Sequence, residues 1–157
     1  MLLSAHILTG AAIAAKIQNP ILGIFLAFLS HYLLDILPHA EYSIENIKTK
    51  QWKKSTPDFF RVFLDAFLGI ALIILITNNN FVALLGGLAA MVPDGLTLLF
   101  ILFPKNKLLK LHQKGHSWLN GFIIKREIPY FWGILSQIAI SAVAIYFLLS
   151  PQILPWD

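Results

Sequence analysis

The chain has 157 residues and a net charge of +4; 57% of its residues are hydrophobic and only 13% are charged. A typical soluble domain is about one quarter charged, so this composition excludes an ordinary soluble domain and indicates an integral membrane protein. The sequence has no cysteine, which excludes disulfides and thiolate metal ligands.

The apolar residues fall into five runs. The first, residues 2–15, carries His6, has no basic residue ahead of it and is not followed by a small-residue cleavage site, so we interpret it as a retained, short or tilted membrane helix. Each of the others is near the length of about 20 residues that crosses a hydrocarbon core of about 30 Å. They cover 20–38, 59–77, 81–103 and 128–150. The pattern predicts an all-α, polytopic membrane protein with about five transmembrane helices, formed by residues 1–157 as a single domain.

Turn signals separate these runs. Asn19-Pro20 predicts a tight turn, and the uncharged segment "NNN", residues 78–80, predicts another between the third and fourth helices. Pro38 ends the second helix, because the residue before a proline is pushed out of the helical region. The fourth helix has a face of small residues on which another helix can pack closely: Gly86, Gly87, Ala89 and Ala90.

Eleven of the twelve Lys and Arg residues lie in or beside two connections, at about 40–58 and 104–127. Two helices and the turn at 78–80 separate these connections, so both face the same side, which the positive-inside rule identifies as the cytoplasm. We therefore expect an inner-membrane protein with its N-terminus in the cytoplasm and its C-terminus outside. Topology accounts for the basic residues, so membrane lipid is the expected partner and nucleic acid is not.

The segment "SHYLLDILPHAEY", residues 30–42, places ionisable groups in an apolar helix. His31 and Asp35 are four residues apart, which puts them on one helix face. Counting from the cytoplasmic end of each helix, at about 1.5 Å per residue, places groups from four helices in one layer of the membrane. Such groups are costly inside a membrane and usually mark a functional site. The candidate metal ligands are His6, His31, Asp35, His39, Asp65 and Asp94.

Imidazole and carboxylate ligands together suit zinc, with manganese or iron as alternatives. A divalent ion would also offset the charge of carboxylates that are otherwise buried without a partner. Other interpretations of single residues stay open: His6 bonded to a carbonyl, Asp65 paired with Arg61, and His112 and His116 as solvated loop residues. For the whole set the alternative is a proton or cation relay, against which the almost purely aliphatic outer half of the helices argues.

The segments "SAHILTG", "SHYLLDILPHAEY" and "MVPDG" resemble those of small multi-pass prokaryotic proteins classed as membrane-bound, predicted metal-dependent hydrolases. The likeness follows the order of the motifs through most of the chain: His6 and Gly10; His31, Asp35, Pro38 and His39; Pro93 and Asp94; His112 and His116. It implies a metal site and hydrolase activity in a prokaryotic membrane. The chain departs from the better-characterised branch after Asp94, where that branch has a further acid and a histidine, and at Gln113, where it lacks an arginine.

We therefore expect a metal-dependent hydrolase that acts near the cytoplasmic headgroup layer, on a lipid phosphoester or ester. A bound divalent ion would polarise a phosphoryl or acyl group and supply hydroxide near neutral pH. The candidate catalytic residues, as acid-base groups, are Glu41, His112 and His116, with Glu45 as a second acid near the mouth of the site. The competing expectation is a non-catalytic membrane protein with a structural metal site or a proton relay.

Overall fold

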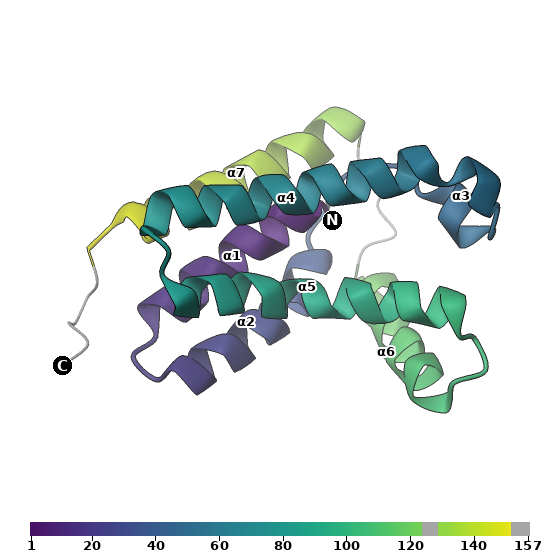
Figure 1. Cartoon of the computed structure of the whole chain (residues 1–157), viewed down its shortest axis with the longest axis horizontal. Helices are drawn as coiled ribbons and strands as arrows, with labels where there is room; N and C mark the ends of the chain where they lie inside the picture. Colours follow the sequence, from purple (N-terminus) through teal and green to yellow (C-terminus); the bar gives the residue numbers. More distant parts are fainter. Residues whose placement is uncertain (124–128, 152–157) are drawn as a thin grey trace.

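A computed structural model describes residues 1–123 and 129–151 of the chain (Figure 1). The end of the predicted 104–127 connection, with Lys125 and Arg126, lies outside these residues. Within the described part every regular element is helical, which confirms the all-helical prediction. The elements are α1 Leu3–Lys16, α2 Pro20–Asp35, α3 Glu45–Lys48, a 3-10 turn at Trp52–Lys54, α4 Thr56–Thr77, α5 Phe81–Leu102, α6 Lys107–Ile123 and α7 Tyr130–Leu149.

Three helices, α4, α5 and α7, are long and apolar enough to cross a membrane. Helix α2 is apolar but shorter, and α1 is shorter still. At about 1.5 Å per residue, the 14 residues of α1 and the 16 of α2 measure about 21 and 24 Å, against a hydrocarbon core of about 30 Å. The described residues therefore have the helices of a membrane protein, with three candidate spans and one shorter apolar helix, α2; the count of five spans stays a prediction.

The second helix ends earlier than its apolar run. The run reaches residue 38, but α2 ends at Asp35, and the Ile36 N–H bonds to the Leu34 carbonyl. The residues before Pro38 leave the helical path, as expected of a chain that approaches a proline. Asp35 therefore occupies the last helical position, and His39 lies in the connection that follows.

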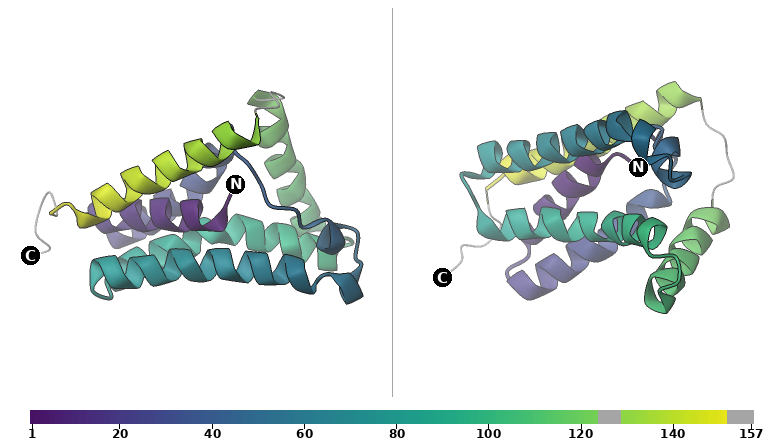
Figure 2. Two further views of the ribbon diagram at one scale, coloured as in Figure 1. Left: turned by 90° about the horizontal axis from the view of Figure 1, so that it is seen from above. Right: turned by 45° about the vertical axis from the view of Figure 1, so that its right-hand side comes forward.

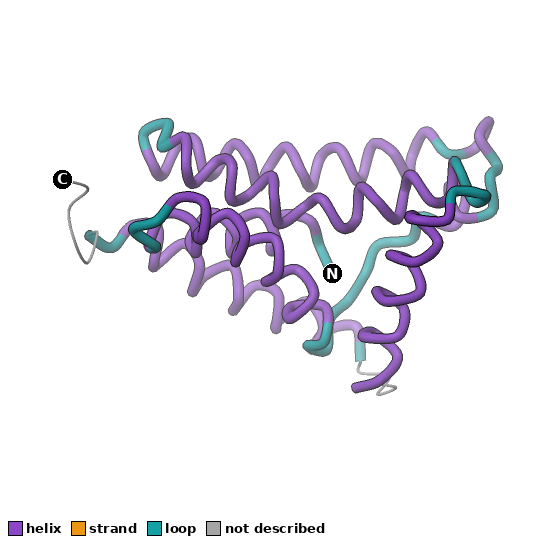
Figure 3. Tube along the Cα trace, turned by 90° about the horizontal axis from the view of Figure 1, so that it is seen from below, coloured by secondary structure: helices purple, strands orange, loops and turns teal. Residues whose placement is uncertain are grey.

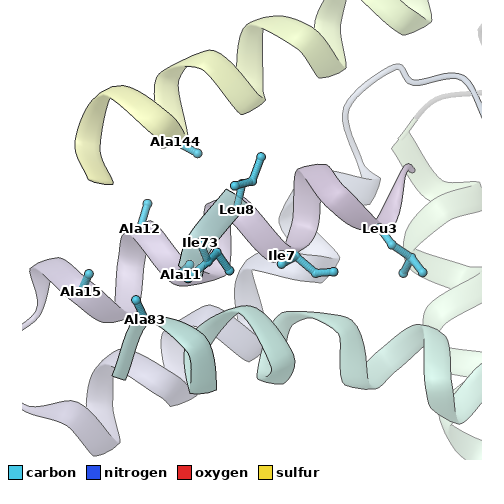
Figure 4. Close-up of a cluster of buried hydrophobic side chains, with 9 residues drawn as sticks. All are labelled: Leu3, Ile7, Leu8, Ala11, Ala12, Ala15, Ile73, Ala83 and Ala144. Atoms are coloured by element: carbon cyan, nitrogen blue, oxygen red, sulfur yellow. The ribbon is translucent and has the colours of Figure 1, made fainter. Parts of the chain in front are cut away.

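Helix α1 is the centre of the packing. It lies between α5 and α7 and also contacts α2 and α4 (Figure 2). Its buried side chains Ile7, Leu8 and Ala11 form the core with Ile73 of α4 and Ala83 of α5 (Figure 4). Small residues allow the close approach, since a Cβ atom added to Gly10 would lie 2.6 Å from the Gly86 carbonyl oxygen of α5.

The arrangement of the helix ends positions the site. The α1–α2 turn and the α4–α5 turn lie at the same end of the molecule, while the start of α1 lies well inside it (Figure 1). Because α1 and α2 are short, their open end meets the middle of α5 rather than the far end of α4 and α5. Helix α6 crosses this region, and the loop after α2 runs past the start of α1 (Figure 3).

Candidate metal centre

Three side chains bring one donor atom each to a common point. His31 Nε2 lies 3.3 Å from Asp35 Oδ2 and 3.3 Å from His116 Nε2, and the last two atoms are 3.1 Å apart. His31 and Asp35 come from successive turns of α2, and His116 comes from α6. All three residues are buried. We call this set the trio.

The tautomer of His31 is determined by its second nitrogen. His31 Nδ1 lies 2.9 Å from the backbone carbonyl oxygen of Ala90 in α5. A carbonyl can only accept, so Nδ1 is the donor and, in the neutral ring, Nε2 presents a lone pair. That lone pair faces Asp35 Oδ2, which is also an acceptor when the carboxylate is ionised. Two acceptors at this distance need a proton or a cation between them.

The spacing of the trio fits a divalent ion. A tetrahedral zinc ion with bonds of about 2.0–2.1 Å holds its ligand atoms about 3.3–3.4 Å apart. An octahedral ion with bonds of about 2.1 Å holds neighbouring ligands about 3.0 Å apart. The observed separations of 3.1 to 3.3 Å lie within this range. The donor set of two imidazoles and one carboxylate is one that zinc commonly uses.

His6 and Asp94 lie beside the trio. With His31 they form a second group whose donor atoms lie within 4.8 Å of one another. His6 Nε2 lies 3.1 Å from Asp35 Oδ1, the oxygen turned away from the other two imidazoles, and the His6 ring stacks on His31. The trio and this second group share His31, and one imidazole nitrogen binds only one ion. The two groups are therefore neighbouring positions for a single ion. In the trio position, His6 orients the carboxylate, as residues behind a metal ligand commonly do.

Asp65 and His39 are placed elsewhere. Asp65 accepts the backbone N–H groups of Leu3 at 2.6 Å and Ser4 at 3.3 Å, so it caps the start of α1. Arg61 lies 3.4 Å from Asp58, which is the residue it pairs with instead of Asp65. His39 Nε2 lies 3.1 Å from Glu41 Oε1 in the exposed loop after α2. Neither Asp65 nor His39 joins the trio.

Glu41 and Tyr42 lie in the connection that follows α2. The hydrogen bond from His39 lowers the pKa of Glu41 to about 2. Burial, and then the nearby carboxylates of Asp65 and Asp94, raise the pKa of the Tyr42 hydroxyl well above its ordinary value. Glu41 therefore carries its charge throughout the physiological range, and Tyr42 keeps its proton.

His112 lies one turn before His116 on α6. Its Nε2 atom is 3.1 Å from the hydroxyl of Tyr32, and its ring stacks on that of His116. Burial, and then the neighbouring His116, lower the pKa of His112, so a neutral imidazole faces Tyr32. A hydroxyl and a neutral imidazole together form a group that can pass a proton beside the trio.

Two positioning residues were missed by the sequence analysis. Tyr32 directly follows His31, and its aromatic ring in an apolar helix gave no signal by itself. Gln137 of α7 is buried; it accepts the Leu2 N–H at 2.6 Å and donates to the Ala40 carbonyl at 2.9 Å. It thereby ties both ends of the α1–α2 hairpin to α7. An amide side chain in the apolar run 128–150 is a signal that the rule applied to the carboxylates would also have found.

A comparison with protein families, with curated proteins and with solved structures finds no match for this chain. The resemblance to predicted membrane hydrolases therefore stays a prediction, and the site is interpreted from its geometry.

Proposed function

We propose that the chain is a membrane-embedded, metal-dependent hydrolase that cleaves an ester or phosphoester bond near the cytoplasmic headgroup layer of a prokaryotic inner membrane. His31, Asp35 and His116 hold the divalent ion, which we assign as zinc, with manganese or iron as the alternatives. The observation that carries this proposal is the convergence of three buried donor atoms, His31 Nε2, Asp35 Oδ2 and His116 Nε2, within 3.1 to 3.3 Å of one another.

The surrounding side chains have separable roles. His6 holds the outer oxygen of Asp35, and Ala90 holds His31 in the tautomer that frees Nε2. A bound divalent ion supplies a polarised substrate oxygen and a hydroxide near neutral pH. In hydrolysis the oxygen of a water molecule would join phosphorus or the acyl carbon while the bond to the leaving ester oxygen breaks. That leaving oxygen would take a proton, which the Tyr32–His112 pair beside the trio can donate.

The proposed orientation places the site toward the cytoplasm. The N-terminus faces the cytoplasm, α1 and α2 enter the bilayer without the length of full spans, and the C-terminus lies outside. The basic connections carry Lys48, Lys50, Lys53, Lys54, Lys105, Lys107, Lys110 and Lys114 on the cytoplasmic side. This charge distribution supports the orientation through the positive-inside rule.

A proton relay is the competing function, because Asp35 contacts three imidazoles that could exchange protons: His6, His31 and His116. Metal content separates the two functions. Protein purified in detergent should hold roughly one zinc or manganese ion per chain, because three protein ligands and a water molecule complete a catalytic zinc site. His116→Gln should lose the ion, and His39→Gln, outside the trio, should keep it. A tight site should be almost completely filled after zinc or manganese is added. A metal content below about 0.3 ions per chain under these conditions would refute the metal site.

Hydrolysis is measured separately from metal binding. Metal-loaded protein is assayed with an aryl phosphodiester and an aryl ester, because these report bond cleavage without a lipid substrate. We expect release of the aryl alcohol by wild type and by His39→Gln but not by His116→Gln. Equal rates for metal-loaded wild type and for metal-free His116→Gln would mean that hydrolysis does not need the ion. That result would assign the ion a structural role.

A further inference from the structure

A groove runs beside the trio, between α2 and α6. Its volume is about 400 Å³, within the range of about 300–1,000 Å³ for ligand pockets. Its surface is almost wholly apolar except where it meets the site. The side chains that line it are Tyr32, Leu108, Leu111, His112, His116 and Leu119. Along α6, Leu108 and Leu111 precede the two histidines and Leu119 follows them, so aliphatic side chains flank His116 and the Tyr32–His112 pair.

Helix α6 presents its leucines outward as well as into this groove. The exposed fractions of Leu108 and Leu111 are 77% and 68%, which in water would be an apolar patch. The same helix carries Lys107, Lys110 and Lys114 and no acidic residue. Apolar and cationic side chains on one helix are the combination that binds the surface of an anionic membrane. The open side of the groove therefore lies against the headgroup and upper acyl layer of the lipids.

We propose that this groove holds the acyl chain of an anionic lipid, and that the ester or phosphoester group of that lipid lies at the trio. The inference rests on the proposed function and names its substrate class. A soluble ester would leave the leucines of the groove unused, whereas an amphiphile matches both the leucines and the polar groups between them. The α6 lysines, Lys107, Lys110 and Lys114, lie outside the lining of the groove but on the same helix, so their charge favours a lipid with a negative headgroup.

Gly115 gives a direct test, since it lines the groove and a Cβ added there would meet no atom within 4 Å. Gly115→Leu should fill the groove without displacing the fold. Gly95→Leu is the matched control, because a Cβ at Gly95 of α5 also meets no atom within 4 Å and Gly95 does not line the groove. The full-length protein is placed in nanodiscs with a phosphatidylglycerol that carries a photoactivatable diazirine in its acyl chain, and labelled residues are mapped by mass spectrometry.

We expect label on Leu108, Leu111 or Leu119 in wild type and in Gly95→Leu, and its loss in Gly115→Leu. Equal label in Gly115→Leu, or equal label from the matching phosphatidylcholine probe, would overturn the inference. Metal content is measured on the same samples. Protein that holds metal but gives no label in the groove refutes this inference alone. Protein that gives the label but binds no metal refutes the proposed function, and with it the role of the lipid as a substrate.

Discussion

Replacing Asp35 by asparagine keeps the shape of the side chain and removes its charge. In the structure this carboxylate contacts His116 at 3.1 Å, His31 at 3.3 Å and His6 at 3.1 Å. Loss of a residue that only orients a metal ligand costs about 10- to 100-fold in metal affinity, so loss of this ligand should cost at least as much. Metal that binds only the folded protein, at a hundred times its Kd, stabilises it by about 2.7 kcal/mol.

The melting temperature converts this stabilisation into a measurement. For a chain of this size each kcal/mol shifts Tm by about 2–4 °C, so a chelator should lower the Tm of wild type by roughly 5–10 °C. The same chelator should leave Asp35→Asn unmoved, because that variant holds little metal. The assay is thermal unfolding of the detergent-solubilised protein, with and without chelator, at fixed protein and metal concentrations.

Asp65→Asn is the control for a carboxylate that acts outside the trio. Asp65 caps α1, and loss of such a cap costs about 0.5–2 kcal/mol. The Tm of Asp65→Asn should lie below that of wild type by the same amount with and without chelator. Chelator should therefore lower the Tm of this variant as much as it lowers that of wild type. The metal site is refuted if chelator leaves wild type unmoved while Asp35→Asn melts higher, because the buried charge of Asp35 would then be a liability that asparagine removes.

Three further predictions concern packing, topology and the exposed loop. Gly10→Ala should destabilise the protein by about 1–3 kcal/mol, because its Cβ would lie 2.6 Å from a carbonyl oxygen of α5, whereas Gly95→Ala should be nearly neutral; denaturant titration of both variants compares them. Asn79→Cys should react with an impermeant thiol reagent added outside the cell, and labelling only from the cytoplasm would invert the proposed orientation. Because the pKa of Glu41 is lowered, its ionised form stabilises the fold above pH 4.5 and that contribution is lost between pH 4.5 and about 2. Glu41→Gln should therefore show a flatter decline of Tm with falling pH than wild type, and an identical decline would contradict the assigned cause.

The sequence predicted the features that depend on local chemistry. The turn at 78–80 is present, and Asn78 and Asn79 adopt φ values of 49° and 65°, a left-handed conformation that asparagine tolerates better than most residues. The small-residue face of the fourth apolar run packs against α1 at Gly86, as its composition indicated. The i, i+4 spacing also placed His31 and Asp35 on one face of a single helix.

The features that depend on how the helices pack against one another could not be predicted from the sequence. Spacing alone put His112 and His116 on one helix face, but only the contact of α6 with α2 and α5 shows that His116 enters the trio while His112 bonds Tyr32. Asp65 lies at the depth along its helix at which metal ligands were expected. It caps α1 instead, because α1 begins without a side-chain cap of its own and its free N–H groups point at this carboxylate.

The shortness of the α1–α2 hairpin also explains how a buried carboxylate is tolerated in so apolar a chain. The turn of the hairpin lies at the same end of the molecule as the turn at 78–80, and from there its helices of 14 and 16 residues extend only about 21 and 24 Å, against a hydrocarbon core of about 30 Å. Its open end therefore stops about 6–9 Å short of the length of a full span, and α6 packs against α2 there. A full-length span at this position would have buried Asp35 in aliphatic packing. A short one leaves room for three histidines from three helices, His6, His31 and His116, to surround the carboxylate.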